Sequence, residues 1–338
     1  YYNRGNSLQR VKRFDEAIES YKRSIDISPD YPEAHCNLAI AFQELKRYEE
    51  SIESFDKAIA INPKYAEAYS NSGVSFKELK RLDEAVARYK LAIEINPDYA
   101  EAYSNLSVAL HDLKRFQEAL ENCDRAISLK PDFSGAHYNR GLALQGLNCL
   151  KEALNSYDRA IAIAPDYAQA YCNRGVVLQD LRDLKAAIAS YNRASELNPN
   201  YPSAYWNKSV ALLLSGDLIN GWPLYEWRWT PELTTSTIRH FKQPLWIGNE
   251  DIKGKTILLH CEQGVGDSIQ FCRYTKLVHD LGASVILEAP KSLVGLFKHL
   301  AGVDEIIEAG QSLPAFDYHC PLMSLPLAFG TELATIPQ

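Results

Sequence analysis

Apolar and polar residues follow a helical pattern along the first two-thirds of the chain. From position 68 to 79, apolar or small residues recur at the spacing of one helix face. A short polar turn follows at positions 80–81, and a second amphipathic pattern begins at Leu82. Pro97 ends this second pattern, because proline disfavours helix in the residue before it. The pattern predicts a helix–turn–helix unit in which neither helix can bury its apolar face alone.

This unit recurs every 34 residues. The segment AEAYSN occurs at positions 66–71 and again at 100–105, and each copy ends in asparagine. A proline and an aromatic residue two positions after it keep the same period. The periodic asparagines are Asn3, Asn37, Asn71, Asn105, Asn139, Asn173 and Asn207. A fixed period between about 20 and 50 residues indicates an architecture of stacked repeats.

Small and large residues also alternate in register with the repeat. The small residues in the middle of the first helices are Gly5, Ala39, Gly73, Ser107, Gly141, Gly175 and Ser209. The large residues on the second helices are Tyr21, Phe55, Tyr89, Tyr157 and Tyr191. Because protein interiors are close-packed, each small residue is expected to make room for a large one on the facing helix.

With an alanine early in the second helix, an aromatic residue four positions on and a terminal proline, this pattern resembles the tetratricopeptide repeat family. The resemblance covers residues 1–229, or about seven repeats. It implies an all-α superhelical solenoid whose first helices line a concave groove. In this family the groove is the usual site for a protein or peptide partner.

The periodic asparagines lie on the first helix, two residues before the small packing position. The family resemblance places them in the groove, where each carboxamide could match the C=O and N–H of an extended peptide. Such a ladder is similar to that of O-linked N-acetylglucosamine transferases, in which these repeats precede a glycosyltransferase. In the alternative interpretation, the asparagines hydrogen-bond within the scaffold or are simply solvated.

Acidic residues also collect on the first helices of the early repeats. They are Glu33, Glu44, Glu67, Glu78, Glu101 and Asp112. If they face the groove, they favour a basic or hydroxyl-rich peptide. Lys-Arg pairs at positions 46–47, 80–81 and 114–115 could neutralise this field, so a solvated stripe is the alternative.

The seventh unit departs from the pattern. Its second helix reads LINGWPLYEWRW, with Gly221 where the other units have alanine or serine. Three tryptophans, Trp222, Trp227 and Trp229, are large for a helix that only caps an array. The segment is predicted to be a rigid joint to the following domain, and a self-contained capping helix is the alternative.

The last hundred residues have a different periodicity. After a polar linker at 230–252, four short runs rich in β-formers alternate with amphipathic helical patterns in 253–338. The predicted strands lie at 255–261, 283–290, 303–310 and 315–326, and the predicted helices at 267–282 and 292–302. Gly282 is the expected C-cap of the first helix. This alternation predicts a parallel sheet of the Rossmann type.

The loop EQGVGD, positions 262–267, follows the first predicted strand. Ligands of open parallel sheets bind at the carboxyl ends of strands, where this loop should lie. Its glycines, Gly264 and Gly266, are predicted to allow tight turning and close backbone approach. The loop lacks the third glycine of a dinucleotide fingerprint and the GK[ST] ending of a phosphate-binding loop.

The stretch from the first strand to PAFDYHCPLMSLP resembles the N-terminal half of a GT-B glycosyltransferase related to the ADP-heptose heptosyltransferases. This resemblance makes Asp267 of the Gly266-Asp267 pair the candidate general base. Glu262, Gln263, Gly264, Gly266 and Arg273 are the accompanying cleft candidates. The usual Thr-Pro is replaced by SIQFCRY, and an N-terminal helix cap is the alternative role for Asp267.

In a GT-B enzyme the nucleotide-sugar donor binds mainly to a second Rossmann domain. The sequence stops at Gln338, so this chain is expected to bind no cofactor and to be inactive by itself, whereas a longer parent protein could use a nucleotide sugar. The first functional hypothesis is therefore a peptide-binding array that presents a substrate to a glycosyltransferase. The second is a non-catalytic interaction scaffold with a vestigial Rossmann cap.

Composition narrows the classes of partner. The formal net charge of −7 argues against nucleic acid or an anionic membrane as a general partner. No apolar run approaches the length of about 18–20 residues that a membrane helix needs. The seven cysteines show no zinc or redox spacing, so reduced thiols in a cytoplasmic protein are expected. His260-Cys261 and His319-Cys320 predict no metal site, because neighbours on a strand point to opposite faces.

Overall fold

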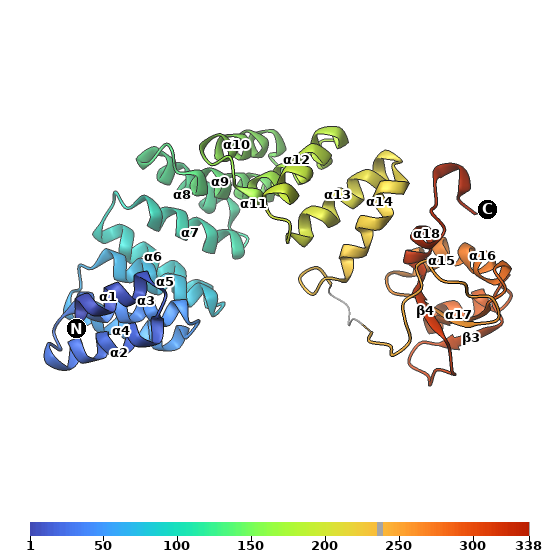
Figure 1. The fold of residues 1–338 in the computed structure, drawn as a ribbon. Coiled ribbons are helices and arrows are strands. Elements are labelled where there is room, and N and C mark those ends of the chain that lie inside the picture. The colour runs from blue at the N-terminus through green and yellow to red at the C-terminus, as the bar shows by residue number, and fades with distance from the viewer. Residues whose placement is uncertain (235–238, 338) are drawn as a thin grey trace. The chain divides into compact units, whose positions relative to one another are not determined.

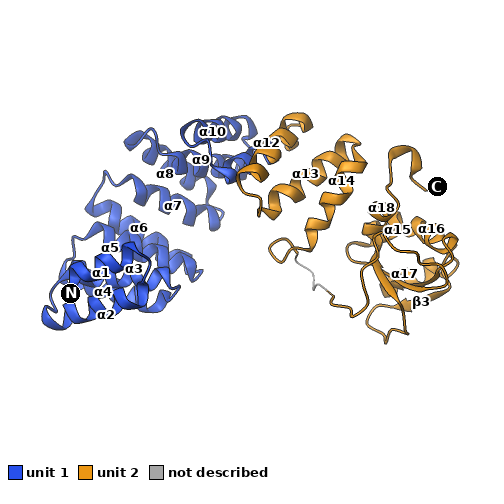
Figure 2. Cartoon of the chain, viewed as in Figure 1, with its two compact units in different colours: residues 1–177 blue, residues 178–338 orange. Residues whose placement is uncertain are grey.

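The structure is a computed structural model that describes residues 1–234 and 239–337 (Figure 1). Positions 235–238 of the predicted linker and Gln338 lie outside the described residues. The chain divides into two compact units, Tyr1–Val177 and Leu178–Gln338 (Figure 2). This division reflects compactness alone. It does not test the predicted boundaries between the repeats, the linker and the sheet domain, which stay a prediction.

The first unit consists of helices that pack in succession, two for each 34-residue repeat (Figure 1). They are α1 (Tyr2–Arg10), α2 (Phe14–Ile27), α3 (Pro32–Glu44), α4 (Tyr48–Ile61), α5 (Ala66–Glu78), α6 (Leu82–Ile95), α7 (Ala100–Asp112), α8 (Phe116–Leu129), α9 (Ser134–Gly146), α10 (Leu150–Ile163) and α11 (Ala168–Asp180), the last of which continues into the second unit. Asn96 is extended and ends α6 directly before Pro97. The predicted helix–turn–helix repeat is confirmed.

The predicted pairing of small with large residues holds the two helices of a repeat together. A Cβ atom added to Gly73 would lie 2.6 Å from Cε1 of Tyr89, too close for any side chain there. Gly5 stands in the same relation to Tyr21, and Gly141 to Tyr157, each with a gap of 2.5 Å. Two repeats use other combinations sixteen residues apart: Ala39 shares a core cluster with Phe55, and Ser107 contacts Cys123. Volume is therefore matched within each repeat.

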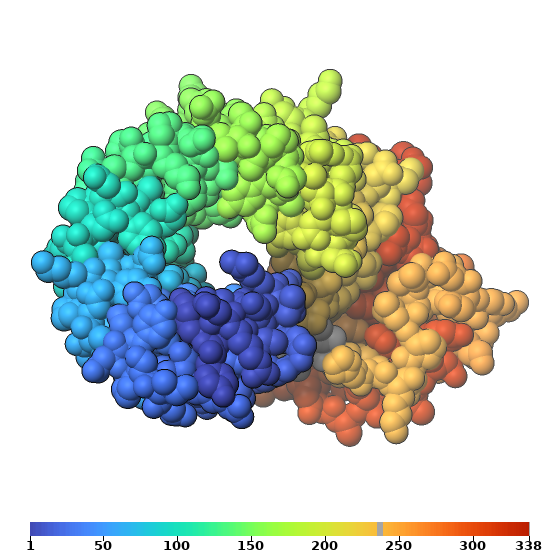
Figure 3. Space-filling view, turned by 60° about the vertical axis from the view of Figure 1, so that its left-hand side comes forward, coloured from blue at the N-terminus to red at the C-terminus, as the bar shows by residue number. Residues whose placement is uncertain are grey.

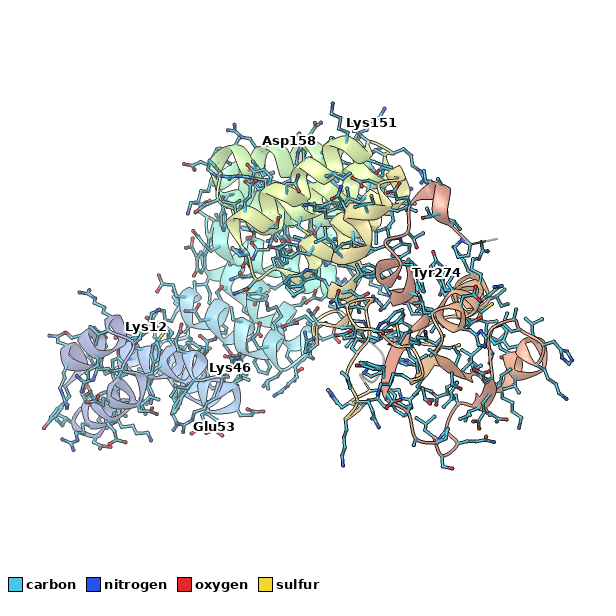
Figure 4. All side chains as sticks on the ribbon, turned by 45° about the vertical axis from the view of Figure 1, so that its right-hand side comes forward. Lys12, Lys46, Glu53, Lys151, Asp158 and Tyr274 are labelled. Carbon is cyan, nitrogen blue, oxygen red and sulfur yellow. The ribbon has the colours of Figure 1, made fainter. Side chains whose placement is uncertain are left out.

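The turn between the two helices of each repeat contains a left-handed residue that the sequence pattern did not predict. The non-glycine residues in this conformation are Lys12, Lys46, Lys80, Lys114, Asn148 and Arg182, with φ between 58° and 68°. Figure 4 labels Lys12 and Lys46 at two of these turns. In the seventh unit the equivalent residue is Gly216, with φ 86°. Glycine adopts this region without steric cost, so the first six turns are the strained ones.

The second unit begins with the last helices of the array. These are α12 (Leu184–Leu197), α13 (Pro202–Ser215) and α14 (Leu218–Tyr225), which continues as the 3₁₀ helix η1 (Glu226–Trp229). A Cβ atom on Gly221 would lie 2.6 Å from Cδ2 of Leu213. The departure from alanine at this position therefore has a packing cause, since a methyl group there would overlap the side chain of Leu213.

The remainder of the second unit is built on a four-stranded sheet. Its strands are β1 (Thr256–His260), β2 (Ser284–Ala289), β3 (Glu305–Glu308) and β4 (Tyr318–Pro321), and all pair in parallel in the order β3-β2-β1-β4. The strands are joined or followed by α15 (Val265–Phe271), η2 (Cys272–Tyr274), α16 (Thr275–Asp280), α17 (Lys291–Phe297), η3 (Leu322–Ser324), α18 (Leu325–Ala328) and η4 (Leu333–Thr335). The four predicted strands are present, but the fourth, predicted over 315–326, is a strand only at Tyr318–Pro321, and the chain is helical from Leu322 to Ala328. Gly282 is left-handed after α16, with φ 87°.

The predicted continuous helix over 267–282 is wrong, because the 3₁₀ segment η2 interrupts it. The hydroxyl of Thr275 donates to the carbonyl oxygen of Cys272 at 2.8 Å and lies 2.9 Å from that of Ala301. A side chain that hydrogen-bonds to a carbonyl three residues back competes with the regular helical ladder. The regular helix is therefore interrupted at η2, between α15 and α16.

One hydrophobic core joins the last helices of the array to the sheet. It contains Tyr225 of α14, Ile257 and Leu259 of β1 and Phe271 of α15. Trp222 is partly buried against this core, and its ring meets that of Phe271 edge-on at 5.8 Å. Aromatic residues bury large areas, so α14 shares a core with the sheet domain, as predicted for a joint.

Candidate functional site

The first helices of the early repeats expose one stripe each. In α5 the accessible residues Glu67, Asn71, Val74 and Glu78 follow one another at helical spacing along one face, while Ala68, Ser70, Ser72, Gly73, Ser75 and Phe76 are buried. The equivalent residues are Glu33, Asn37, Ile40 and Glu44 in α3, and Glu101, Asn105, Val108 and Asp112 in α7. We call these three sets together the acidic first-helix stripe. Three ladder asparagines, Asn37, Asn71 and Asn105, and all six acidic residues of the sequence prediction lie on it.

The stripes of neighbouring repeats lie side by side. Among α1–α10, each first helix approaches the next one, α1 with α3, α3 with α5, α5 with α7 and α7 with α9, more closely than second helices approach each other. The first helices therefore line the inner side of the curve of the first unit. In the space-filling view, residues 1–177 curve around a hollow (Figure 3).

The ladder asparagines Asn37, Asn139 and Asn173 hydrogen-bond to the preceding repeat. The Nδ2 of Asn37 donates to the Tyr2 hydroxyl and to Asn6 Oδ1, both at 2.9 Å. Asn139 donates to Ser104 Oγ at 3.1 Å, and Asn173 donates to the Tyr138 hydroxyl at 2.9 Å. Each hydroxyl partner lies 35 residues earlier in the chain. At these positions the carboxamide bridges consecutive repeats, which was the alternative role considered for the ladder.

Asn71 and Asn105 differ from these three. Within residues 1–234, the side chains of both are half-buried and make no hydrogen bond to the scaffold. The residue 35 positions before Asn71 is Cys36, a buried thiol whose pKa is raised to about 11 by desolvation. The residue 35 positions before Asn105 is Ser70. Its buried Oγ makes no hydrogen bond of normal geometry, although the Tyr99 hydroxyl is near. Asn3 is exposed, and Asn207 is half-buried.

The acidic side chains of the stripe are exposed, and the turn arginines do not pair with them. Instead the arginines bind glutamates of the second helices, Arg47 with Glu50, Arg81 with Glu84 and Arg115 with Glu118. Glu78 pairs with Lys77 at 3.1 Å and Glu101 with Lys130 at 3.0 Å, and Asp112 lies 3.8 Å from His111. Glu33, Glu44 and Glu67 have no ion-pair partner within the described array.

In the sheet domain, Glu262 of the loop after β1 forms a buried ion pair. Its Oε1 accepts from Nη2 of Arg228 at 2.9 Å, and both side chains are only 5% exposed. The backbone N–H of Met323 also donates to Glu262 at 3.2 Å. Burial raises the pKa of the Glu262 carboxyl, and the charge of Arg228 opposes this shift. Glu262 therefore fastens the loop to η1, and its carboxylate is hydrogen-bonded to protein groups.

Arg228 was missed by the sequence analysis, although it stands alone among the aromatic residues of YEWRW. Besides Glu262, its guanidinium donates to Glu226 Oε1 at 2.7 Å, to Ser324 Oγ at 2.8 Å and to the carbonyl oxygen of Tyr225 at 3.1 Å. All three nitrogens are used, so the buried charge is fully hydrogen-bonded. A single cation inside an aromatic run was the available signal.

The other loop residues are more accessible. Gln263, Gly264 and Gly266 are exposed, and Gly264 is the N-cap of α15 with φ −65°. Neither glycine is left-handed, so the predicted tight turning is not required of them, and a Cβ on Gly266 would meet only open space. Asp267 is the third residue of α15, and its Oδ2 accepts from the Gly264 N–H at 3.2 Å. This is the capping role considered for it.

The structure does not bring Arg273 together with the rest of the predicted cleft. Its Nε donates to the carbonyl oxygen of Gln270 at 2.8 Å, and Nη1 donates to that of Pro337 at 3.2 Å. It lines a pocket of about 240 Å³ with Trp222 and Tyr274. Glu262 and Gln263 line a different pocket of about 420 Å³, which includes no part of Arg273.

The proximity of a buried histidine, His260, to a half-buried one, His319, was also missed. His260 of β1 and His319 of β4 lie on one face of the sheet, with ring centroids 5.6 Å apart, and Phe241 packs against both. Desolvation lowers the pKa of His260 to about 3, and that of His319 is lowered for the same reason. Nowhere in the described ranges 1–234 and 239–337 do three His, Cys, Asp or Glu side chains gather as a metal site would require.

Comparison with known families identifies the array. A profile described as TPR repeat matches residues 5–46, 73–114 and 147–181. Profiles described as tetratricopeptide repeat match residues 32–65, 100–133 and 168–201. The chain belongs to the tetratricopeptide repeat family. All of these matches lie within residues 5–201, which are the regular repeats.

Solved structures show the same helical fold. The Cut9–Hcn1 hetero-tetramer of the APC/C is 16% identical, with a TM-score of 0.60 over 70% of this chain and 47% of that chain. PilF of Pseudomonas aeruginosa is 17% identical, with a TM-score of 0.53 over 58% of this chain and 90% of that chain. YrrB, described as a TPR protein with an unusual peptide-binding site, is 21% identical, with a TM-score of 0.45 over 55% of this chain and 96% of that chain.

No curated protein matches this tetratricopeptide repeat chain. Among the helices that the structure describes, none is both long enough and apolar enough to cross a lipid bilayer.

Proposed function

We propose that this tetratricopeptide repeat protein binds an extended polypeptide along its first helices. The observation that carries the proposal is the pair Asn71 and Asn105, which lie one repeat apart on adjacent first helices without a scaffold hydrogen bond. A carboxamide has two donors and one acceptor atom, so each can engage both polar groups of a peptide backbone. Backbone recognition of this kind depends little on the sequence of the partner.

The ladder then has two kinds of rung. Asn37, Asn139 and Asn173 use amide hydrogens to join repeats, so fewer of their polar groups remain for a ligand. Asn71 and Asn105 keep the complete carboxamide for the partner. Asn3 and Asn207 remain proposed contacts at the two ends of the ladder.

Paired substitutions test this division. Asn71→Ala with Asn105→Ala should weaken binding of a fluorescein-labelled serine–alanine peptide by about 1–3 kcal/mol, or about 5- to 150-fold in Kd. The matched control is Asn139→Ala with Asn173→Ala, which removes two inter-repeat hydrogen bonds. The control should lower the midpoint of thermal unfolding and change the peptide affinity much less. Equal affinity losses in the two double variants would remove the special role of Asn71 and Asn105.

A second candidate function adds group transfer to peptide binding. In it, residues 253–338 form the acceptor-side half of a GT-B glycosyltransferase, to which the array presents its peptide. Two observations support this candidate. The parallel order β3-β2-β1-β4 is also that of the first four strands in doubly wound nucleotide-binding folds. The loop after β1, with exposed Gln263 and Gly266, lies where such folds bind ligands.

In this candidate, Asp267 would take the proton from the attacking hydroxyl, and a nucleotide sugar would be the donor, held mainly by a second domain. Asp267→Asn is the informative change, because the asparagine Oδ1 can still accept from the Gly264 N–H and preserve the start of α15. Sugar transfer by the full-length protein, followed by intact mass of the products, should be lost in the variant. Transfer at the unsubstituted rate would show that Asp267 is not the base. No transfer from any donor would leave a scaffold with a non-catalytic sheet domain.

A further inference from the structure

The acidic first-helix stripe has a charge pattern that is confined to part of the array. In α3, α5 and α7, the residues at both ends of the stripe are acidic, namely Glu33 and Glu44, Glu67 and Glu78, Glu101 and Asp112. The same positions in the next three first helices are Gly135 and Gly146, Gln169 and Asp180, and Ser203 and Leu214. The acidic ends are therefore a property of repeats two to four and not of every repeat.

The neighbouring cations leave much of this charge uncompensated. The turn arginines of these repeats are held by second-helix glutamates. Within the described residues, the lysines that pair with the acids of the stripe are Lys77 and Lys130, and His111 lies near Asp112. Lys46, Lys80 and Lys114 follow the distal acids in the exposed turns and make no ion pair with them within the described array. Glu33 and Glu67, at the first turns of α3 and α5, stay unpaired. Acids in a first turn also stabilise their helix, but that role needs no alignment with a ladder.

Between these acids lie the polar groups that the scaffold leaves unused. Asn71 and Asn105 belong to the same two stripes, and Ser70, only 1% exposed, buries an Oγ that lacks a normal hydrogen bond. In the next repeat the equivalent serine, Ser104, accepts a hydrogen bond from Asn139, 35 residues later, at 3.1 Å. An unsatisfied buried hydroxyl beside a free carboxamide is costly unless another group completes it. The side chains of Ser70, Asn71 and Asn105 in α5 and α7, which lack a normal hydrogen bond, therefore lie in the acidic part of the array.

We infer that α3, α5 and α7 bind an extended polypeptide segment that carries lysine or arginine side chains. Asn71 and Asn105 engage its backbone, and Glu33 and Glu67 engage its cations. Charge complementarity selects this partner over a neutral or acidic peptide. The inference rests on the proposed peptide-binding function and adds the chemical class of the partner and the repeats that select it.

The test measures binding of three labelled peptides, lysine–alanine, serine–alanine and glutamate–alanine, to the whole chain by fluorescence anisotropy. The lysine–alanine peptide should bind most tightly, and its affinity should fall as ionic strength rises. Glu33→Gln with Glu67→Gln should weaken the lysine–alanine peptide by about two- to twentyfold. Binding of the serine–alanine peptide should not change.

The matched control removes the same charge from second helices. Glu53 of α4, labelled in Figure 4, and Glu94 of α6 are exposed and make no ion pair within the described array. Glu53→Gln with Glu94→Gln should leave all three affinities unchanged. If the serine–alanine or glutamate–alanine peptide binds as tightly as the lysine–alanine peptide, the inference is overturned while peptide binding stands. If none of the three peptides binds, the proposed function itself fails.

Discussion

The regular pair α5–α6 and the last pair α13–α14 solve the same packing problem in different ways. In the regular pair, Gly73 admits the ring of Tyr89, and the two helices need nothing outside the array. In the last pair, Gly221 admits Leu213, and the aromatic residues are turned toward the sheet instead. A buried ion pair, Arg228 with Glu262, replaces the next repeat.

This difference separates two sources of stability. A regular repeat gains stability from local volume matching that is copied every 34 residues. The joint gains it from long-range contacts that occur once. All five tryptophans lie at or after position 206, so tryptophan fluorescence reports the second unit, while far-UV circular dichroism is dominated by the helices of the array. The two signals therefore allow the two regions to be followed separately during unfolding.

The largest effect is expected at the joint. Arg228→Ala leaves Glu262 buried without its partner, and loss of one member of a buried pair costs about 3–5 kcal/mol. Unfolding followed by tryptophan fluorescence should shift to lower denaturant, while circular dichroism of the array changes little. Arg228→Met with Glu262→Leu should recover much of the loss, since both charges are removed. The control is Lys276→Ala in the exposed pair with Asp280, and a loss of similar size there would contradict the role of burial.

The next effect is expected within a regular repeat. Gly73→Ala places a methyl group 2.6 Å from the ring of Tyr89, and overpacking of this kind costs about 1–3 kcal/mol. Circular dichroism should show earlier unfolding, with the tryptophan signal unchanged. Tyr89→Leu in the same chain should restore part of the loss, because it removes the ring carbons Cε1 and Cζ that the methyl group would meet. Unchanged stability in the single variant would mean that the helices separate at no cost.

Acid should weaken the sheet before the array. The pKa of His260 is about 3 in the folded protein, against an ordinary value of 6.5, so the unfolded chain binds its proton first. The stability that neutral His260 permits is complete above pH 6.5 and is lost as pH falls toward 3, at up to about 1.4 kcal/mol per pH unit. Denaturant unfolding by tryptophan fluorescence at pH 7, 6 and 5 measures this slope. His260→Phe should flatten it, and an equal slope in both proteins would assign the acid sensitivity to other groups.

The smallest effect is expected at a turn. Lys80→Gly relieves a left-handed lysine, a gain of about 1–2 kcal/mol, but glycine loses about 0.5–1 kcal/mol of that through chain entropy. The net result should be a modest rise in the unfolding midpoint by circular dichroism. Lys90→Gly in the middle of α6 is the control and should lower the midpoint. A fall for both variants would show that the turn is unstrained.

The repeats could be predicted from the sequence because their constraints are local and copied. The spacing of Gly73 and Tyr89, or the extended Asn96 before Pro97, follows from neighbouring residues alone. The left-handed Lys80 could not be predicted in this way, since lysine has no special preference for that conformation. The broken helix at Thr275 depends on Ala301, a contact made only after the chain has folded.

The contacts around the candidate site differ in how far the sequence can predict them. The asparagines and acids of the stripe recur every 34 residues, so the sequence predicts that they share one helix face. The ladder asparagines that hydrogen-bond to the preceding repeat do so with a residue 35 positions earlier, as Asn37 does with Tyr2. The identity of that residue is a signal that the sequence contains. The pairing of Arg228 with Glu262 and the proximity of His260 to His319 arise from contacts between distant elements, which no periodicity encodes.

The sixteen-residue pairing also limits how such an array can be inherited. A first helix with glycine fits a tyrosine helix, as in Gly73 with Tyr89, whereas Ala39 is matched to Phe55. Recombination inside a repeat, between a glycine–tyrosine unit and the Ala39–Phe55 unit, would set alanine against tyrosine. A crossover in the loops between repeats, as at Pro63, would keep every pair intact. Between unlike units the array can therefore be shuffled without mismatch only in whole repeats, and each inserted copy brings its own internal fit with it.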